Sequence, residues 1–70
     1  MEQTIKDYFK QHMLGTIKDI VPMQNWEQGK RYCVVLRFIT TRSFLVYEKD
    51  NQIIAIKEYH NDKGFQSIFP

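Results

Sequence analysis

The chain has 70 residues, a length that allows one small domain and leaves no room for a cleft between two domains. Its residues are 43% hydrophobic and 14% aromatic, which excludes a disordered chain, while the formal net charge of +2 excludes neither an acidic nor a basic partner. We therefore expect residues 1–70 to be a complete small protein with one domain. Because the core of so short a chain contributes only about 3–5 kcal/mol, burial of a further apolar face against a partner would add useful stability.

Three features bear on the location of the protein. The single Cys33 lies inside an apolar segment, where it suits a small buried hydrophobic residue in a reducing compartment. No apolar run approaches the roughly 18 to 20 residues that span a bilayer, and the N-terminal residues lack the basic start and apolar run of a signal peptide. These features predict a cytoplasmic protein without a membrane partner.

An amphipathic helix is predicted from Thr4 onward, because apolar residues recur there at steps of three and four. Thr4 is the predicted N-cap, and Pro22 prevents continuation past Val21. Gly15 leaves the end of the helix open, since Leu14-Gly15 could equally be its C-terminus. Residues 16–21 would then form a second helical turn or an extra strand. The apolar stripe consists of Ile5, Tyr8, Phe9, Met13, Ile17, Ile20 and Val21.

Residues 22–30 contain a proline, a glycine and several polar side chains, which is typical of a loop. Trp26 is the exception within this loop. Its large apolar surface is costly to leave in water, which favours packing over an edge of the core. The alternative is that Trp26 contacts a partner, because tryptophan is over-represented in binding hot spots.

Three strands are predicted at residues 31–39, 43–48 and 52–59, from alternating β-branched and aromatic residues. Lys49-Asp50-Asn51 separates the last two strands and has the chemistry of a tight turn. The predicted fold is therefore α+β, with an N-terminal amphipathic helix packed on a three-stranded antiparallel β-meander.

The alternation divides the strand residues between two faces, of which one helix can cover only one. The face predicted to pack on the helix contains Tyr32, Val34, Leu36, Phe38, Phe44, Val46, Ile54 and Ile56. The other face contains Val35, Arg37, Ile39, Leu45, Tyr47, Ala55, Lys57 and Tyr59. Two alternatives remain for this second face: the tail residues Phe65, Ile68 and Phe69 cover it, or it meets a partner.

The sequence carries no recognisable catalytic, metal-binding or phosphate-binding motif. His12 lies beside the apolar stripe of the helix, and a metal site needs three or four ligands in a spacing that His12, Cys33 and His60 do not show. The three glycines are isolated, so no loop resembles a phosphate cradle. We expect a protein that is not an enzyme and needs no cofactor, metal ion or small-molecule substrate.

The main functional prediction is a small non-catalytic regulator or inhibitor that binds another protein, or a second copy of itself, through the second sheet face. Its aromatic and apolar side chains are those that interface cores favour, and such economy of size suits a phage or mobile-element protein. Free strand edges offer a second mode of attachment. The predicted contact residues are Trp26, Arg37, Tyr47, Lys57 and Tyr59.

The alternative prediction is a nucleic-acid-binding sheet. Tyr47 and Tyr59 would stack on bases, while basic residues of the same half of the chain would neutralise phosphates. The basic residues concerned are Arg31, Arg37, Arg42, Lys49 and Lys57. Glu48 and Glu58 lie among them in the sequence and argue against this reading.

Overall fold

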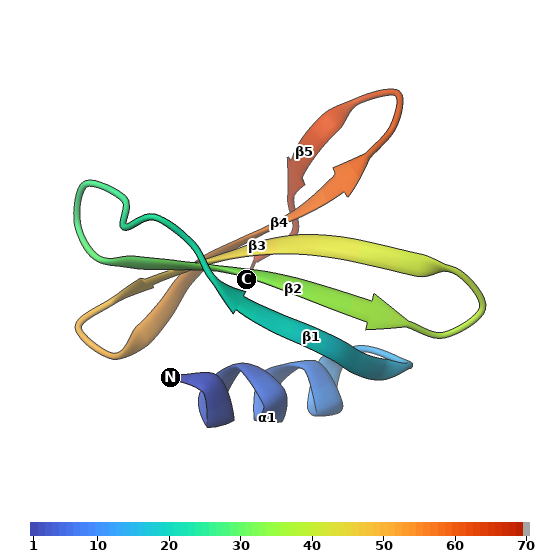
Figure 1. Cartoon of the computed structure of the whole chain (residues 1–70), viewed down its shortest axis with the longest axis horizontal. Helices are drawn as coiled ribbons and strands as arrows, with labels where there is room; N and C mark the ends of the chain where they lie inside the picture. The colour runs from blue at the N-terminus through green and yellow to red at the C-terminus, as the bar shows by residue number, and fades with distance from the viewer. Residues whose placement is uncertain (70) are drawn as a thin grey trace.

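The structure is a computed structural model that describes residues 1–69, and it joins one N-terminal helix to a five-stranded antiparallel sheet (Figure 1). The α+β class is confirmed, but the prediction of three strands is wrong. The strands follow one another as neighbours in the order β1-β2-β3-β4-β5, which is a simple meander. The elements are α1 (Glu2–His12), β1 (Thr16–Pro22), β2 (Lys30–Arg37), β3 (Thr41–Lys49), β4 (Gln52–His60) and β5 (Gly64–Ser67).

Residues 16–22 form a strand, which settles the alternative left open by the sequence. Gly15 has a φ of 118°, a value that favours glycine, and a Cβ at this position would lie 2.8 Å from the backbone oxygen of Arg37. The chain therefore turns at Gly15 and pairs with β2, with Ile17 opposite Leu36 and Ile20 opposite Val34. Pairing with β2 satisfies the backbone of this segment and overrides its helical periodicity.

The helix is shorter than the apolar stripe suggested. It begins at Glu2, with Met1 as the N-cap and no side-chain capping bond, so the prediction of Thr4 as the cap is wrong. It ends at His12, two residues before Leu14-Gly15. The buried side chains of its apolar face are Ile5 and Phe9.

The core lies between α1 and one face of the sheet. Its fully buried side chains are Ile5, Phe9, Val34, Leu36, Phe44, Val46 and Ile56, and all five strand members were predicted for this face. Two further assignments are wrong. Phe38 lies beyond the end of β2 and is exposed, and a register shift between Tyr47 and Glu48 directs Ile53 rather than Ile54 toward the core.

The hairpin between β3 and β4 confirms the predicted turn. Asp50 and Asn51 have φ values of 53° and 62°, and these are the residue types that tolerate such backbone. Two successive positive φ values are the mark of the turn whose twist matches that of paired strands. The residue types at the turn therefore determine where this hairpin forms.

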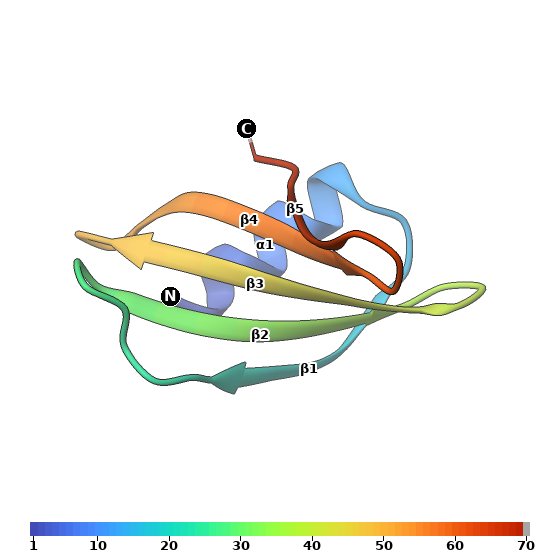
Figure 2. The same ribbon diagram turned by 90° about the horizontal axis from the view of Figure 1, so that it is seen from above.

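The tail does not cover the second face of the sheet. Gly64–Ser67 adds the fifth strand beside β4, and after it Ile68 and Phe69 return to pack on the core. The ring of Phe69 lies 5.6 Å from that of Tyr8 on the helix. Figure 2 shows the helix on one side of the sheet. Within residues 1–69, no helix has the length and apolar character needed to cross a membrane.

Candidate functional site

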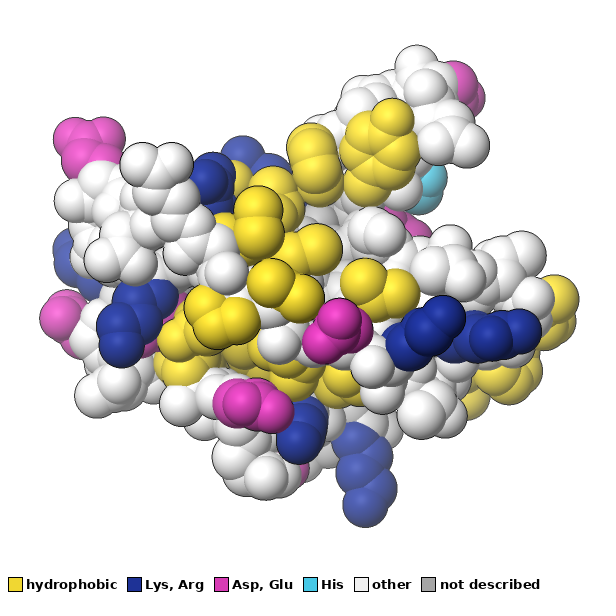
Figure 3. All heavy atoms as spheres, in the orientation of Figure 1, with side chains coloured by type: hydrophobic (Ala, Val, Ile, Leu, Met, Phe, Trp, Pro, Cys, Tyr) yellow, Lys and Arg dark blue, Asp and Glu magenta, His cyan; other side chains and the backbone are white. Residues whose placement is uncertain are grey.

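The face of the sheet turned away from α1, here called the outer face, is the candidate site. Figure 3 shows hydrophobic side chains in a band that runs from the β4–β5 hairpin across the sheet. The centre of the face is half-buried rather than buried, because α1 and the tail pack on the opposite side. The cross-strand register places these side chains on it: Val21, Cys33, Val35, Leu45, Tyr47, Ala55, Lys57, Tyr59 and Phe65.

Three of the predicted contact residues meet at one end of the outer face. The indole Nε1 of Trp26 donates a hydrogen bond of 3.0 Å to the backbone oxygen of Glu48, which holds the loop against the sheet. The Trp26 ring meets Tyr47 edge-on at 5.5 Å, and the Nζ of Lys57 lies 5.2 Å from the centre of the Tyr47 ring. A shallow hollow of about 310 Å³ opens here, lined by Trp26, Tyr47, Ile54, Ala55 and Lys57.

Trp26 thus combines both roles that the sequence left open. It is half-buried and covers the edge of the sheet near Glu48, yet it also forms a wall of the hollow. A partner side chain that entered the hollow would contact the indole, the phenol of Tyr47 and the alkyl stem of Lys57. Such apolar contact with aromatic walls is typical of binding hot spots.

A second aromatic pair extends the outer face on β4 and β5. Tyr59 opposes Phe65 across the two strands, their rings lie 5.2 Å apart, and each side chain is close to half exposed. The sequence does not predict Phe65 as a member of this face, because Phe65 belongs to the tail that was one of two candidate covers for it. The signal available was the short run Gly64–Ser67 after a polar turn, which is too brief to predict a strand by itself.

Arg37 does not join these clusters. It is the last residue of β2, and Arg31, which opposes Tyr47, lies six residues earlier. At about 3.3 Å per residue this places Arg37 roughly 20 Å along the strand from Tyr47. The predicted set of five therefore divides into Trp26, Tyr47 and Lys57 in one cluster, with Tyr59 beside Phe65 and Arg37 at the far end.

The two glutamates that argued against nucleic acid lie away from the outer face. Glu48 and Glu58 are both buried, and Glu58 opposes the core residue Phe44. Arg42 binds the Glu58 carboxylate through Nε at 2.6 Å and through Nη2 at 2.8 Å. These hydrogen bonds lower the pKa of Glu58 below its usual value, against the opposing effect of burial. Among the strand residues described, Asp19 is the one acidic side chain on the outer face.

The strand edges are poorly suited to pairing with another chain. β1 contains an irregularity between Ile17 and Asp19 and ends at Pro22, and both features disturb the hydrogen-bonding edge. β5 has only four residues. The outer face is therefore a better contact surface than either edge.

The reactive side chains are scattered over the molecule. Within residues 1–69, no group of three or more His, Cys, Asp or Glu residues could hold a metal ion. The exposed His12 ring lies 4.4 Å from that of Tyr8, while His60 Nε2 lies 3.9 Å from Glu58 Oε1. Cys33, predicted to be a small buried residue, is half-buried in the centre of the outer face. The expectation that the protein is not an enzyme stays a prediction.

Comparisons with protein-family models, curated proteins and solved structures found no match to this chain. Its function is therefore inferred from the contacts and exposure of its own residues.

Proposed function

We propose that the protein is a non-catalytic binding protein, a regulator or inhibitor that occupies another protein through the outer face of its sheet. The observation that carries this proposal is the band of apolar and aromatic side chains on a face that α1 and the tail leave open. Contiguous exposed apolar surface is costly unless a partner covers it. A partner therefore explains why the face is not polar.

The composition of the outer face supports a protein partner. Its centre is formed by small and aliphatic side chains such as Cys33, Val35 and Leu45. The aromatic clusters of Trp26 with Tyr47 and of Tyr59 with Phe65 lie to the sides. An apolar centre with aromatic anchors is the usual anatomy of a protein interface. In a dimer with two-fold symmetry, the outer face of each copy would cover the outer face of the other.

The experiment compares capture from an extract of cells that naturally contain the protein, using a tagged wild type and two double variants. Tyr47→Ser with Lys57→Ser removes two walls of the hollow, whereas Lys10→Ser with Gln11→Ser changes the exposed side of α1. We expect a partner retained by the wild type and the helix variant but lost with the outer-face variant. Retention by all three, with folding checked by circular dichroism, would contradict the proposal.

Self-association is measured on the same three proteins by sedimentation equilibrium. A wild-type dimer that becomes a monomer only in the outer-face variant would identify a second copy as the partner. A dimer that persists in the outer-face variant would show that the interface lies elsewhere.

A second candidate function is binding of single-stranded nucleic acid. The observation in its favour is that Glu48 and Glu58 lie away from the outer face, which leaves Tyr47 and Tyr59 on either side of Lys57. Stacking on tyrosine and pairing of phosphates with lysine is how sheet platforms hold single strands. An amide NMR titration with short DNA and RNA oligonucleotides tests it. Shifts at these three residues that fade as salt rises would favour nucleic acid, because phosphate contacts depend steeply on ionic strength.

We also propose a cytoplasmic location. Cys33 is a free thiol that is only half-buried, and such a thiol persists best in a reducing compartment. In a reducing compartment the Cys33 thiol at the centre of the outer face stays unoxidised.

A further inference from the structure

Three large apolar side chains cluster at one end of the molecule, apart from the centre of the outer face. Leu14, Phe38 and Ile39 are 73%, 59% and 85% exposed, the highest values among the large hydrophobic residues. Phe38 and Ile39 lie in the loop between β2 and β3, and Leu14 lies in the connection between α1 and β1. We call this cluster the apolar tip.

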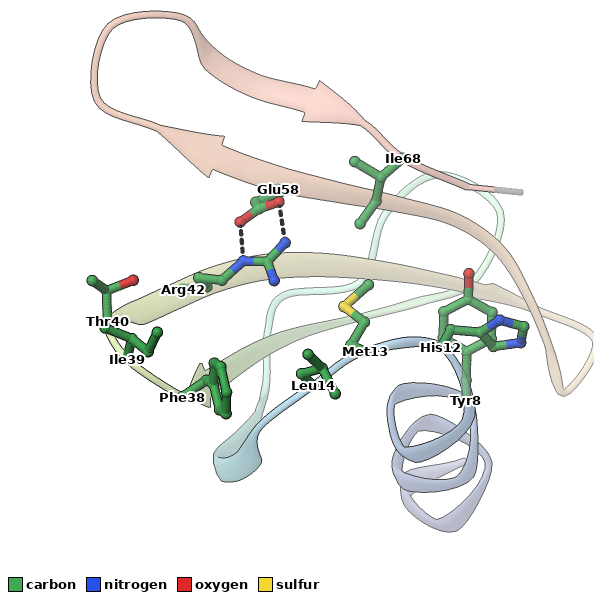
Figure 4. A pocket seen from close by; sticks show the side chains of 10 residues that line it. All are labelled: Tyr8, His12, Met13, Leu14, Phe38, Ile39, Thr40, Arg42, Glu58 and Ile68. Atoms are coloured by element: carbon green, nitrogen blue, oxygen red, sulfur yellow. Dashed lines mark hydrogen bonds and ion pairs between the residues drawn. The ribbon is translucent and has the colours of Figure 1, made fainter.

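Packing of two separate segments holds the apolar tip together. A Cβ on Gly15 would lie 3.1 Å from the Cβ of Phe38, so the connection before β1 passes close against the β2–β3 loop. Leu14 and Phe38 line the same groove and lie side by side in Figure 4. The fold therefore brings the side chains of the apolar tip together from two separate segments.

The apolar tip is a protruding end. Figure 1 shows the β2–β3 loop at the far end of the longest axis, beyond the end of α1. A protein partner would bury such side chains best if they lay on a broad surface, as those of the outer face do. A loop that carries exposed Phe and Ile at its end has the shape that inserts between lipid headgroups.

Two basic side chains, Arg37 and Lys10, lie near the apolar tip. Arg37 directly precedes Phe38, is exposed and makes no ion pair within residues 1–69. Lys10 lines a second hollow beside Gly15 and Thr16, a hollow with no acidic lining residue. The groove behind the tip contains one carboxylate, Glu58, which Arg42 neutralises. In the face drawn in Figure 3, Lys or Arg side chains lie next to the hydrophobic atoms of this end, and an acidic side chain lies beside them toward the centre of the view.

We propose that the apolar tip anchors the protein to the surface of an anionic lipid bilayer, with Phe38 and Ile39 among the headgroups and Arg37 at the phosphates. Apolar insertion and attraction of basic residues to anionic lipids add to one another in surface anchors. The prediction of no membrane partner rests on the lack of an apolar run long enough to span a bilayer and of a signal peptide, whereas a surface anchor needs only a loop. This proposal is independent of the outer face.

The test is co-sedimentation of the whole protein with vesicles of phosphatidylcholine alone and of phosphatidylcholine with 30% phosphatidylglycerol. We expect binding to the anionic vesicles only, and weaker binding as salt rises. Replacing Phe38→Ser and Ile39→Ser should reduce the partition coefficient at least about tenfold. Met23→Ser is the control, since it removes an exposed apolar side chain of the β1–β2 loop, outside both the apolar tip and the outer face, and should leave vesicle binding unchanged.

The electrostatic part is tested with Arg37→Gln against Lys63→Gln, an exposed lysine in the β4–β5 hairpin. A basic residue at an anionic surface should change the partition coefficient about fivefold, so only Arg37→Gln should weaken binding. Trp26 bonds to Glu48, which opposes Lys30 at the start of β2, whereas the apolar tip follows the end of β2 at Arg37. The emission of Trp26 should therefore not shift when wild-type protein binds vesicles.

Three results would overturn the proposal. The first is that the wild-type protein does not bind anionic vesicles, and the second is that the Phe38→Ser, Ile39→Ser variant binds them as well as the wild type. The third is a wild-type dimer that becomes a monomer only in that double variant. The last result would make the apolar tip an interface between copies of the chain.

Discussion

Arg42 and Glu58 form an ion pair with two hydrogen bonds, which joins β3 to β4 beside the core. The Glu58 side chain is only 10% exposed, so its charge depends on the two hydrogen bonds from Arg42. A buried carboxylate without such a partner is costly. This pair therefore stabilises the pairing of the strands that support the outer face.

Glu58→Gln should reduce the free energy of unfolding by about 1–3 kcal/mol at pH 7, because the charge-assisted bonds to Arg42 are lost. The pKa of Glu58 is lowered in the folded protein, so its contribution is present above the unfolded pKa of about 4.3 and is lost as pH falls through the folded pKa. Urea unfolding of wild type and variant should therefore differ at pH 7 and converge only as the pH falls below the lowered pKa of Glu58. Glu27→Gln, in the exposed loop, should match the wild type at both pH values; an equal loss in both variants would contradict this account.

Gly29 is required for close contact between the β1–β2 loop and the sheet. A Cβ at this position would overlap the backbone oxygen of Glu48, which also accepts the hydrogen bond from Trp26. Gly29→Ala should therefore destabilise the fold by about 1–3 kcal/mol and shift the Trp26 indole NMR signal toward its value in water. An unchanged indole signal would show that the loop does not depend on this contact.

The elements that the sequence predicted best are those whose structure depends on local chemistry. Strand alternation from Arg31 to Tyr59 and the Asp50-Asn51 turn predicted three strands and five of the core residues. The two extra strands could not be predicted in this way, because β1 has helix-like periodicity and β5 is four residues long. Both form because a neighbouring strand accepts their backbone hydrogen bonds, which is a tertiary effect.

The same contrast between local pattern and tertiary pairing explains why only part of the candidate site could be predicted. Tyr47, Lys57 and Tyr59 follow from alternation along the predicted strands. The position of Phe65 depends on β5, and the outward direction of Ile54 depends on the register shift at Glu48. Neither β5 nor the register shift has a clear sequence signal. Arg37 was assigned to the right face, but the length of β2 separates it from the aromatic clusters.

The helix contributes to the core through few side chains, so each has a large effect. Phe9 is 1% exposed and its ring meets Phe44 edge-on at 5.1 Å. Phe9→Ala should cost about 3–5 kcal/mol, which is comparable to the whole stability expected of so small a domain. Circular dichroism should show a largely unfolded protein at 25 °C. Leu14→Ala removes an exposed apolar side chain just beyond the helix and should change the free energy of unfolding by less than about 0.5 kcal/mol.

At the scale of the whole molecule, one helix covers one face of a five-stranded sheet and leaves the other open. The open face is apolar at its centre and aromatic at its sides, and the residues that could have covered it add a strand and then pack on the core. This arrangement is the basis for proposing that the protein works by binding through its outer face. The apolar tip is a separate surface at the end of the longest axis.

The most direct measurement is site-specific photo-crosslinking in cells that naturally contain the protein. A photo-reactive phenylalanine analogue replaces Tyr59 on the outer face or, as control, Gln11 on the exposed side of α1. We expect a discrete crosslinked protein product from position 59 and none from position 11. A product from position 11 alone, or from neither position, would contradict the claim that the outer face is the contact surface.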